Sequence, residues 1–438
     1  VHMHAVPTFR KGGVHPPDHK VFSREQEIVR LPLPSELVVA LSQHMGAPAK
    51  PLKAKGDTVE RGEKIGESVG FISADVHSPV NGTIKEIKTV TLPNSVQCDA
   101  FVITVDEKQP GNASKPIAWR KLKKEELFAS IKEHGIVGLG GATFPAHVKF
   151  TVPRDKKVEY FVVNGVECEP YLTSDYRLMM EKGKETLEGI LIAAKILEAE
   201  KIIVGVELNK QDAIDHLKEI VKEKGWPIEV VGLKVKYPQG DEKQLLKAAI
   251  NREIPSGKLP LDVGAVVSNI GTCYAIYEAI VYKKSLYERI ISVTGEGIVN
   301  PKNILAPIGT KVSDLLEFCG GLQGDVEKLV SGGPMMGFAF FDTETPVTKG
   351  SSGILALHAR KKVRRTPCIS CGKCVDACPI GLMPTLLYKH ITNLNYEVAM
   401  NSLSLLDCKE CGSCSYVCPA HLPLVHTFKT GKKMGRKK

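Results

Sequence analysis

The chain has 438 residues, of which 43% are hydrophobic and 25% are charged; the length suits about three domains of about 150 residues each, and the composition excludes collagen-like and wholly disordered chains. No stretch reaches the ~18 uncharged apolar residues of a membrane helix, and residues 1–10 lack the apolar core of a signal peptide, so we expect a cytoplasmic protein. Much of the net charge of +10 comes from 361–365 and 429–438, and without interleaved aromatic residues these basic segments do not indicate nucleic-acid binding.

The first 110 residues divide into an N-terminal extension, 1–37, and a segment, 38–110, that is expected to be all-β. Glycines such as Gly46, Gly56 and Gly62 separate short alternating runs, which predicts hairpins. The pattern resembles a barrel-sandwich hybrid of the lipoyl or biotinyl type. Because no lysine stands at a carrier-type hairpin turn, a docking module is favoured over a covalent carrier.

Residues 118–285 alternate between helical stretches and apolar strands, which predicts an α/β domain with a mostly parallel sheet. Helices are expected over 118–134 and about 184–199. The expected strands are 158–163, 202–206, 228–236 and 264–267.

Polar loops follow the carboxyl ends of these strands, the edge where open α/β sheets bind ligands. Convergence there would bring together Asn164, Glu167, Glu169, Asp241, Glu242, Asn269 and Thr272. Ahead of them, Gly138, Gly140 and Gly141 form a loop whose backbone amides suit a phosphate. The alternatives are a plain turn for the glycines and idle surface carboxylates for the acidic residues.

Residues 286–340 hold glycine-punctuated strands and a helix over 312–317, which indicates a small β-grasp-like unit. Met335 and Met336 are expected to fill its core. Residues 341–360 are interpreted as a linker to a cysteine-rich domain, 361–425. The last segment, 426–438, is interpreted as a solvated basic tail, with contact to anionic lipid or an acidic partner as the alternative.

Eight of the twelve cysteines lie in two runs with the same spacing, C-x-x-C-x-x-C-x-x-x-C-P. Zinc sites favour two separated C-x-x-C pairs and disulfides are disfavoured in the cytoplasm, so zinc and free thiols are the minor alternatives to two 4Fe–4S clusters. In two-cluster ferredoxins the fourth cysteine of each run ligates the other cluster. That pattern assigns the first cluster to Cys368, Cys371, Cys374 and Cys418, and the second to Cys378, Cys408, Cys411 and Cys414. Buried, hydrophobic positions are expected for Cys98, Cys273 and Cys319.

The chain also resembles known families along nearly its whole length. Gly140-Gly141 with Phe144-Pro145, the loops 164–170 and 269–272, and the cubane cysteines resemble the flavin subunit of respiratory complex I. The opening segment 8–17, which reads TFRKGGVHPP, and the paired cysteine runs resemble more closely the RnfC family, which belongs to the Rnf complex, an ion-translocating NAD–ferredoxin oxidoreductase. The chain departs from the complex I pattern at Leu139, Val166 and Cys168, and it has two cluster motifs where that subunit has one.

The resemblance implies a Rossmann-like domain for FMN and NADH, an SLBB-like β-grasp unit and an α-helical two-cluster ferredoxin domain. It implies cofactor contacts for Gly138, Gly140, Gly141, Phe144, Lys149, Asn164, Glu167, Glu169, Gly240, Asp241, Glu242, Asn269 and Thr272. In this assignment the glycine loop and Lys149 lie near the flavin phosphate, and Phe144 stacks on a nicotinamide or adenine ring. The loop 164–169 passes beneath the flavin ring, Asp241 and Glu242 approach the nicotinamide, and the turn 269–272 contacts FMN.

The implied function is electron transfer between NAD(H), non-covalent FMN and two 4Fe–4S clusters, with no catalytic side chain, because flavin converts a two-electron hydride donor into single electrons. The implied partners are membrane-embedded and ferredoxin-like Rnf subunits that couple the reaction to Na⁺ or H⁺ transport at the cytoplasmic face of the membrane. Two alternatives stay open: a soluble reductase of a cobalamin or another metallo-cofactor, and a relay whose flavin site is vestigial.

Overall fold

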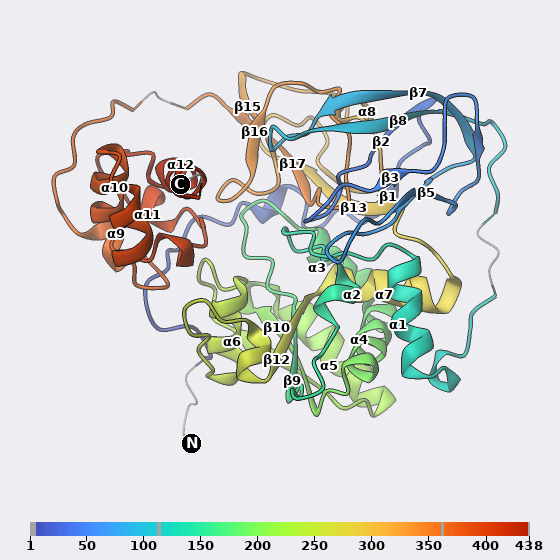
Figure 1. Ribbon diagram of the computed structural model, residues 1–438, viewed down its shortest axis with the longest axis horizontal. Coiled ribbons are helices and arrows are strands. Elements are labelled where there is room, and N and C mark those ends of the chain that lie inside the picture. Colours follow the sequence, from blue (N-terminus) through green and yellow to red (C-terminus); the bar gives the residue numbers. More distant parts are fainter. Residues whose placement is uncertain (1–5, 112–114, 361–362, 437–438) are drawn as a thin grey trace.

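The computed structural model describes residues 6–111, 115–360 and 363–436. The α/β domain lies below two β-rich units in Figure 1, and the helical C-terminal domain lies at the left. Within the described ranges, no helix combines the length and apolar composition needed to span a bilayer. Part of the predicted N-terminal extension (1–5) and of the basic segments (Lys361, Lys362, Lys437 and Lys438) lies outside the described residues.

The N-terminal segment is built into the rest of the molecule. After a short 3₁₀ turn, η1 (Lys20–Phe22), strand β1 (Ile28–Arg30) pairs in parallel with β14 of the β-grasp unit. The predicted extension therefore supplies an edge strand to a sheet that is formed mainly more than 250 residues later in the chain.

The barrel-sandwich unit has two small sheets, with strand orders β2-β8-β7-β4 and β3-β5-β6. Alternate residues of its longer strands point inward, and Leu37, Ile65 and Phe101 are fully buried in its core. Its strands are β2 (Glu36–Ala40), β3 (Lys50–Pro51), β4 (Thr58–Val59), β5 (Lys64–Glu67), β6 (Val76–His77), β7 (Gly82–Thr91) and β8 (Gln97–Val105).

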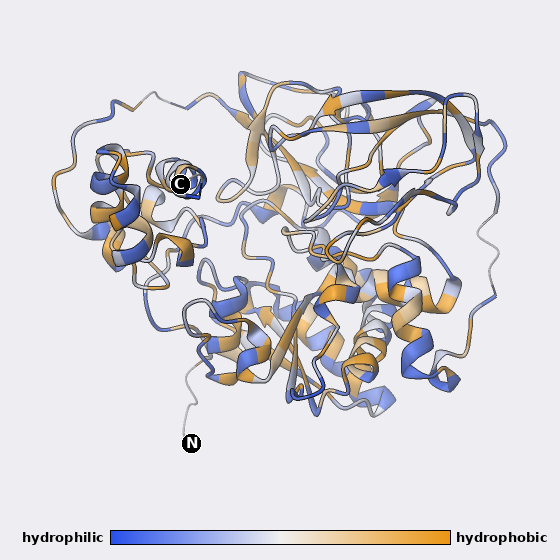
Figure 2. Cartoon of the chain, in the orientation of Figure 1, coloured by the Kyte–Doolittle hydropathy of each residue, from blue (hydrophilic) through white to orange (hydrophobic). Residues whose placement is uncertain are grey.

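The α/β domain has a four-stranded parallel sheet in the order β11-β10-β9-β12. Its strands are β9 (Tyr160–Asn164), β10 (Lys201–Glu207), β11 (Ile228–Leu233) and β12 (Ala265–Asn269). Its helical elements are η2 (Trp119–Lys121), α1 (Lys124–Glu133), α2 (Ala146–Lys149), α3 (Ser174–Glu181), α4 (Gly183–Leu197), η3 (Leu208–Lys210), α5 (Gln211–Lys224), α6 (Glu242–Ile250), η4 (Pro260–Val263) and α7 (Ile270–Tyr282). Figure 2 shows hydrophobic residues along the strands and the inner helices of this domain.

Helices α4 and α7 pack closely in the core of the α/β domain. Gly189 allows this approach, because a Cβ there would overlap the carbonyl oxygen of Cys273. Cys273 and Cys319 are fully buried and Cys98 is buried at 9% exposure, so the expectation for these three thiols is confirmed.

The β-grasp unit is larger than its predicted range. Its sheet has the order β1-β14-β13-β17-β15-β16, and helix α8 (Val312–Phe318) packs on it. The strands are β13 (Glu288–Thr294), β14 (Lys302–Pro307), β15 (Val326–Ser331), β16 (Phe338–Phe340) and β17 (Gly353–His358). The predicted linker 341–360 is wrong over 353–358, because β17 pairs on both sides inside the sheet. Met336 is 44% exposed, so its predicted place in the core is also wrong.

The C-terminal domain is helical and internally repeated. Its elements are α9 (Lys373–Asp376), α10 (Pro384–Thr392), a π-helical turn (Val398–Ser402), η6 (Leu405–Asp407), α11 (Ser413–Tyr416) and α12 (Leu424–Gly435). Helix α12 covers most of the predicted solvated tail. Phe428 lies in the core of the domain at 1% exposure, so this segment is part of the fold.

Candidate functional site

The order of the parallel sheet creates a crevice between β9 and β12. The chain builds β10 and β11 on one side of β9 and then returns to add β12 on the other side. Ligands of open α/β sheets bind at such a reversal, beyond the carboxyl ends of the strands. Asn164 and Asn269 end these two strands and are direct partners in the ladder, so two of the predicted residues face this position.

The glycine loop crosses the same position. The backbone N–H of Leu139 donates to Oγ1 of Thr272 at 2.9 Å, and a Cβ on Gly140 would lie 3.1 Å from Cβ of Asn269. Gly141 has φ +128°, and no atom lies within 4 Å of the place where its Cβ would be. The loop therefore leaves open space at Gly141, next to the N-terminus of the 13-residue helix α7.

The glycine loop is held in place by its own backbone and by residues from the other units. Gly138 donates its N–H to the carbonyl of Phe144 at 2.8 Å, and Thr143 accepts from the N–H of Met45 in the barrel-sandwich unit at 3.1 Å. Arg289, in β13, donates from Nη2 to the carbonyl of Leu139 at 2.8 Å, and burial lowers its pKa to about 10. No sequence motif marks Arg289, which lies 150 residues from the loop.

Two of the predicted acidic residues cap helices. Glu167 accepts backbone N–H donors of α3 from Asp175 at 2.7 Å and Tyr176 at 3.2 Å, and Asp241 accepts from Lys243 and Gln244 of α6 at 3.1 and 3.4 Å. Both carboxylates thus fix the loops in which they lie.

A buried carboxyl that the sequence analysis did not select lies beside them. Asp175 accepts from Nδ2 of Asn269 at 2.8 Å, and burial, followed by the nearby charge of Glu167, raises its pKa to about 7. Its spacing in the sequence gave no signal, because it becomes part of the site only through the packing of α3 against α7.

The remaining predicted residues fall into two groups. Asn164 donates to the carbonyl of Gly240 at 2.8 Å, and Lys149 pairs with Glu242 at 2.9 Å, so these four stay at the crevice with the glycine loop. Glu169 is directed elsewhere: it accepts from the backbone N–H groups of Met335 and Met336 at 3.1 and 2.9 Å. Burial raises the pKa of Glu169 to about 7.

The eight clustered cysteines surround two cavities in the C-terminal domain. One cavity is lined by Cys368, Cys371, Cys374 and Cys418; we call it the outer cavity. The other is lined by Cys378, Cys408, Cys411 and Cys414; we call it the inner cavity. Each cavity therefore takes three thiols from one run and one from the other, the grouping that the spacing predicts.

The two cysteine loops repeat the same backbone conformation 40 residues apart. Left-handed φ angles recur at Ser370 and Glu410, at Gly372 and Gly412, and at Gly381 and His421. In each loop the first sulfur accepts a backbone N–H at 3.4 Å, from Ser370 to Cys368 and from Glu410 to Cys408. Such donors stabilise the thiolate form that binds iron.

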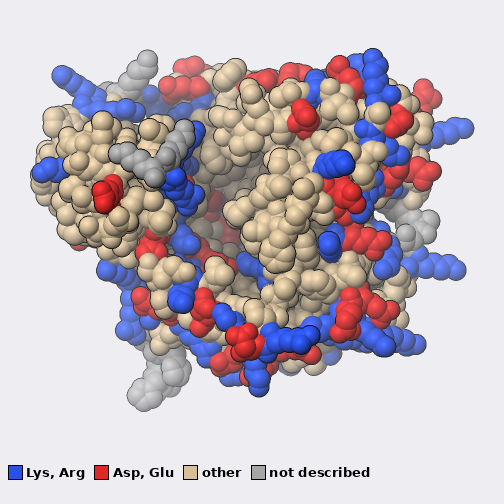
Figure 3. All heavy atoms as spheres, in the orientation of Figure 1, with Lys and Arg blue, Asp and Glu red and all other residues tan. Residues whose placement is uncertain are grey.

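The two cavities differ in exposure. Cys368 and Cys371 are exposed, whereas Cys378, Cys411 and Cys414 are buried. The hydroxyl of Tyr237, in the loop after β11, donates to the carbonyl of Cys411 at 2.6 Å. The inner cavity therefore adjoins the strand-end loops, while the outer cavity opens to solvent. Figure 3 shows this face of the molecule hollowed between the C-terminal domain and the other units.

Family models match all four units in the order in which the chain builds them. They are the RnfC barrel sandwich hybrid domain (8–108), the Nuo51 FMN-binding domain (131–278), the SLBB domain (290–339) and the 4Fe-4S dicluster domain (367–422). These matches confirm the predicted fold class.

Curated relatives cover most of this chain. The C subunit of the proton-translocating ferredoxin:NAD(+) oxidoreductase complex of Clostridium ljungdahlii is 44% identical over 91% of this chain and 87% of its own length. The Na(+)-translocating counterpart of Acetobacterium woodii is 42% identical, covering 85% of each chain. The C subunit of the ion-translocating oxidoreductase complex of Rhodobacter capsulatus is 38% identical over 98% of this chain and 84% of its own.

A solved structure shares the fold at low identity. The NAD⁺-reducing [NiFe]-hydrogenase in its H₂-reduced state has a chain with a TM-score of 0.54 and 16% identity, over 74% of this chain and 64% of its own.

Proposed function

From the premise that this chain belongs to the RnfC family, the C subunits of ion-translocating ferredoxin:NAD(+) oxidoreductase complexes, we propose that it is the subunit at which NAD(H) reacts. The observation that carries the proposal is the combination, in one chain, of an open glycine loop at the switch point of the sheet with two cavities lined by four thiols each. The soluble-reductase alternative is not favoured, since the relatives are named as subunits of ion-translocating complexes.

The residues at the crevice fit a flavin mononucleotide. The glycine loop is open at Gly141, its backbone N–H groups and the start of α7 suit a phosphate, and Lys149 supplies a cation at the same edge. When bound, FMN would accept one hydride, with its two electrons, and release those electrons singly. Around it, Asn164, Asn269 and Thr272 fix the loops, and Phe144 is half-buried at the return of the glycine loop.

The thiols fit two 4Fe–4S clusters, because a cubane needs four cysteines around a void. We assign Cys378, Cys408, Cys411 and Cys414 to the inner cluster and Cys368, Cys371, Cys374 and Cys418 to the outer one. Burial raises the pKa of Cys408 to about 11, so binding of iron must itself stabilise the thiolates. The inner cavity faces the crevice and the outer cavity faces solvent, which makes the outer one the exit toward another subunit. We further propose that the chain is peripheral, at the cytoplasmic face of the membrane.

The test uses the full chain, purified and reconstituted without oxygen. We expect about one FMN and about eight iron atoms per chain, and bleaching of both flavin and cluster absorbance on addition of NADH. A preparation with the expected iron but without flavin, or without any response to NADH, would contradict the proposal and leave an electron relay.

A further inference from the structure

The N-terminal strap, residues 7–17, lies between the α/β domain and the C-terminal domain. In Figure 1 it is the blue segment that passes between α6 and the helices of the C-terminal domain. It carries the segment Arg10-Lys11-Gly12-Gly13-Val14, which belongs to neither the flavin loops nor the cysteine runs. The contacts on its two sides indicate what it does.

One side of the strap is joined to the loop that follows β11. Val14 and Tyr237 exchange two backbone hydrogen bonds, at 2.8 and 2.9 Å, and Lys234 donates its N–H to the carbonyl of Pro7 at 3.0 Å. The hydroxyl of Thr8 donates to Oε1 of Gln239 at 2.8 Å. Phe9, at 1% exposure, lies under the ammonium of Lys236 at 4.2 Å.

The other side of the strap touches the backbone that carries a thiol of the inner cavity. Gly13 donates its N–H to the carbonyl of Ala377 at 2.9 Å. Gly12 has φ +63°, and a Cβ on it would overlap the carbonyl of Cys378. Only glycine combines this backbone conformation with so close an approach.

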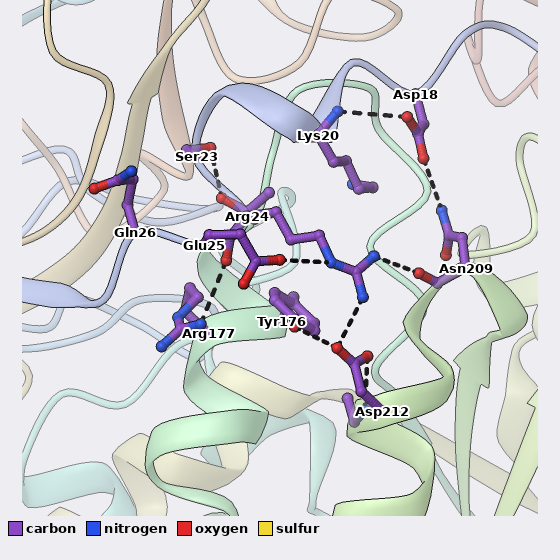
Figure 4. A network of polar contacts seen from close by, with 12 residues as sticks. Asp18, Lys20, Ser23, Arg24, Glu25, Gln26, Tyr176, Arg177, Asn209 and Asp212 are labelled. Carbon is purple, nitrogen blue, oxygen red and sulfur yellow. Dashed lines mark hydrogen bonds and ion pairs between the residues drawn. The ribbon is translucent and has the colours of Figure 1, made fainter.

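Beyond residue 17, the segment is fixed to the α/β domain by a polar network (Figure 4). Arg24 pairs with Asp212 of α5 at 2.8 Å and donates to the carbonyl of Asn209 at 2.6 Å, while Asn209 donates to Asp18 at 3.3 Å. The strap is therefore held at both of its ends by the α/β domain, with its glycines directed to the C-terminal domain.

The covalent connection to the C-terminal domain does not fix the position of that domain as the strap does. Residues 363–367 have no regular structure and are all exposed. The direct polar contacts between the domains include Tyr237 with the carbonyl of Cys411, and Lys243 with Asp407 at 3.7 Å. Tyr237 is itself held by Val14, so this contact also depends on the strap.

We propose that Gly12 and Gly13 are positioning residues: the strap holds the inner cavity against the crevice of the α/β domain and so sets the gap that electrons cross. The redox consequence rests on the proposed function, whereas the mechanical claim does not. Because electron transfer needs the two sites in fixed register, displacement of the strap should slow the transfer between them and leave the reaction at the crevice intact.

The test compares Gly12→Ala with Gly225→Ala in the full, reconstituted chain. Gly225 has φ +62° and no atom within 4 Å of its Cβ position, so the control carries the same backbone strain without the overlap. For Gly12→Ala we expect the amides of Gly13, Val14 and Tyr237 to exchange hydrogen about tenfold faster. We also expect cluster bleaching by NADH to slow about tenfold or more while flavin bleaching keeps its rate.

A second pair of variants, which disturbs the strap less, covers the case in which Gly12→Ala does not fold. Lys236→Met removes the ammonium that covers Phe9 and donates to its carbonyl at 3.1 Å, while Lys234→Met makes the same charge change on an exposed neighbour. We expect Lys236→Met alone to shift both readouts in the same direction.

Four results would overturn the proposal. They are unchanged amide exchange, faster exchange with an unchanged cluster rate, an equal loss of flavin and cluster rates in Gly12→Ala, and equal effects of the two lysine variants. If the unmodified chain takes up no flavin, the proposed function fails, but amide exchange still decides whether the strap joins the domains.

Discussion

At the scale of single residues, the cysteines show how two short loops build sites that neither loop completes. Each loop directs three thiols into its own cavity, while its fourth, Cys378 or Cys418, enters the cavity of the other loop. The left-handed residues at 370, 372, 410 and 412 turn the loops tightly, and the N–H groups of Ser370 and Glu410 reach sulfur. The four thiols that line each cavity therefore come from both runs, and pairs of substitutions test whether the ligand sets follow the cavities or the runs.

We predict that the double variant Cys378→Ala/Cys408→Ala loses one cluster and keeps about four iron atoms per chain, because both thiols line the inner cavity. The double variant Cys368→Ala/Cys378→Ala should lose both clusters, although both thiols belong to the same run. Iron analysis and electron paramagnetic resonance of the reduced protein measure the outcome. The reverse result, with the first variant empty and the second half-loaded, would show that each run holds its own cluster.

At the scale of elements, the polar residues at the strand ends act first as helix caps. Asn269 caps α7, Asp241 caps α6 and Glu167 accepts N–H groups of α3. Each capped helix begins at the crevice, so the same side chains stabilise the start of a helix and fix the segment that leads to it from a strand. The shape of the crevice therefore depends on groups whose hydrogen bonds are directed into the protein.

We predict that Asp241→Ala lowers the free energy of unfolding by about 1 kcal/mol, whereas Asp241→Asn, which keeps a capping oxygen, changes it by no more than a few tenths. Chemical denaturation measures stability, and titration with FMN and NADH measures binding. If Asp241→Asn is stable but binds NADH as poorly as Asp241→Ala, the charge of this carboxylate acts on the nucleotide directly.

The sequence predicts elements well where the signal is local. Helix α4 and strand β10 lie within about two residues of their expected ranges, because long apolar runs bounded by charged residues leave few alternatives. Strand β17 was missed, since a six-residue strand is recognised only through neighbours that lie 22 or more residues away. Helix α12 was hidden by its lysines, although Leu424 and Phe428 have helical spacing and are buried.

The same distinction holds at the site. Glycine loops and cysteine spacings are read directly from the chain, so the residues lining both cavities could be grouped in advance. Arg289, Asp175 and Tyr237 could not, because each reaches the site from an element whose place is set only by the packing of domains.

At the scale of the whole molecule, a buried lysine joins three units. Lys349 of the β-grasp unit donates to the carbonyls of Asp75 in the barrel-sandwich unit and Gly135 in the α/β domain, at 2.6 and 2.7 Å. His77 and His44 lie close by, and burial, followed by the charge of Lys349, lowers their pKa values to about 3 and about 4. The two folded histidines therefore stay neutral at pH values at which the unfolded chain would bind protons.

We predict that this junction weakens the protein in acid. Below about pH 6.5 the unfolded histidines bind protons, whereas the folded ones stay neutral to about pH 3–4, so the free energy of unfolding falls as pH falls through this window. In His77→Gln the loss between pH 7 and pH 5 should be smaller by about 1–2 kcal/mol. Urea denaturation across this range measures it, with the exposed His15→Gln as control; equal slopes in the two variants would refute the assignment.

Each cysteine loop supplies one thiol to the cavity of the other loop, and this bears on how the C-terminal domain arose. Loops that repeat 40 residues apart with the same left-handed turns indicate one copied unit. A lone ancestor of that unit would have carried three thiols around one void and a fourth that pointed away, and so would have closed neither site by itself. A second copy of the unit is therefore needed to supply the thiol that each site lacks.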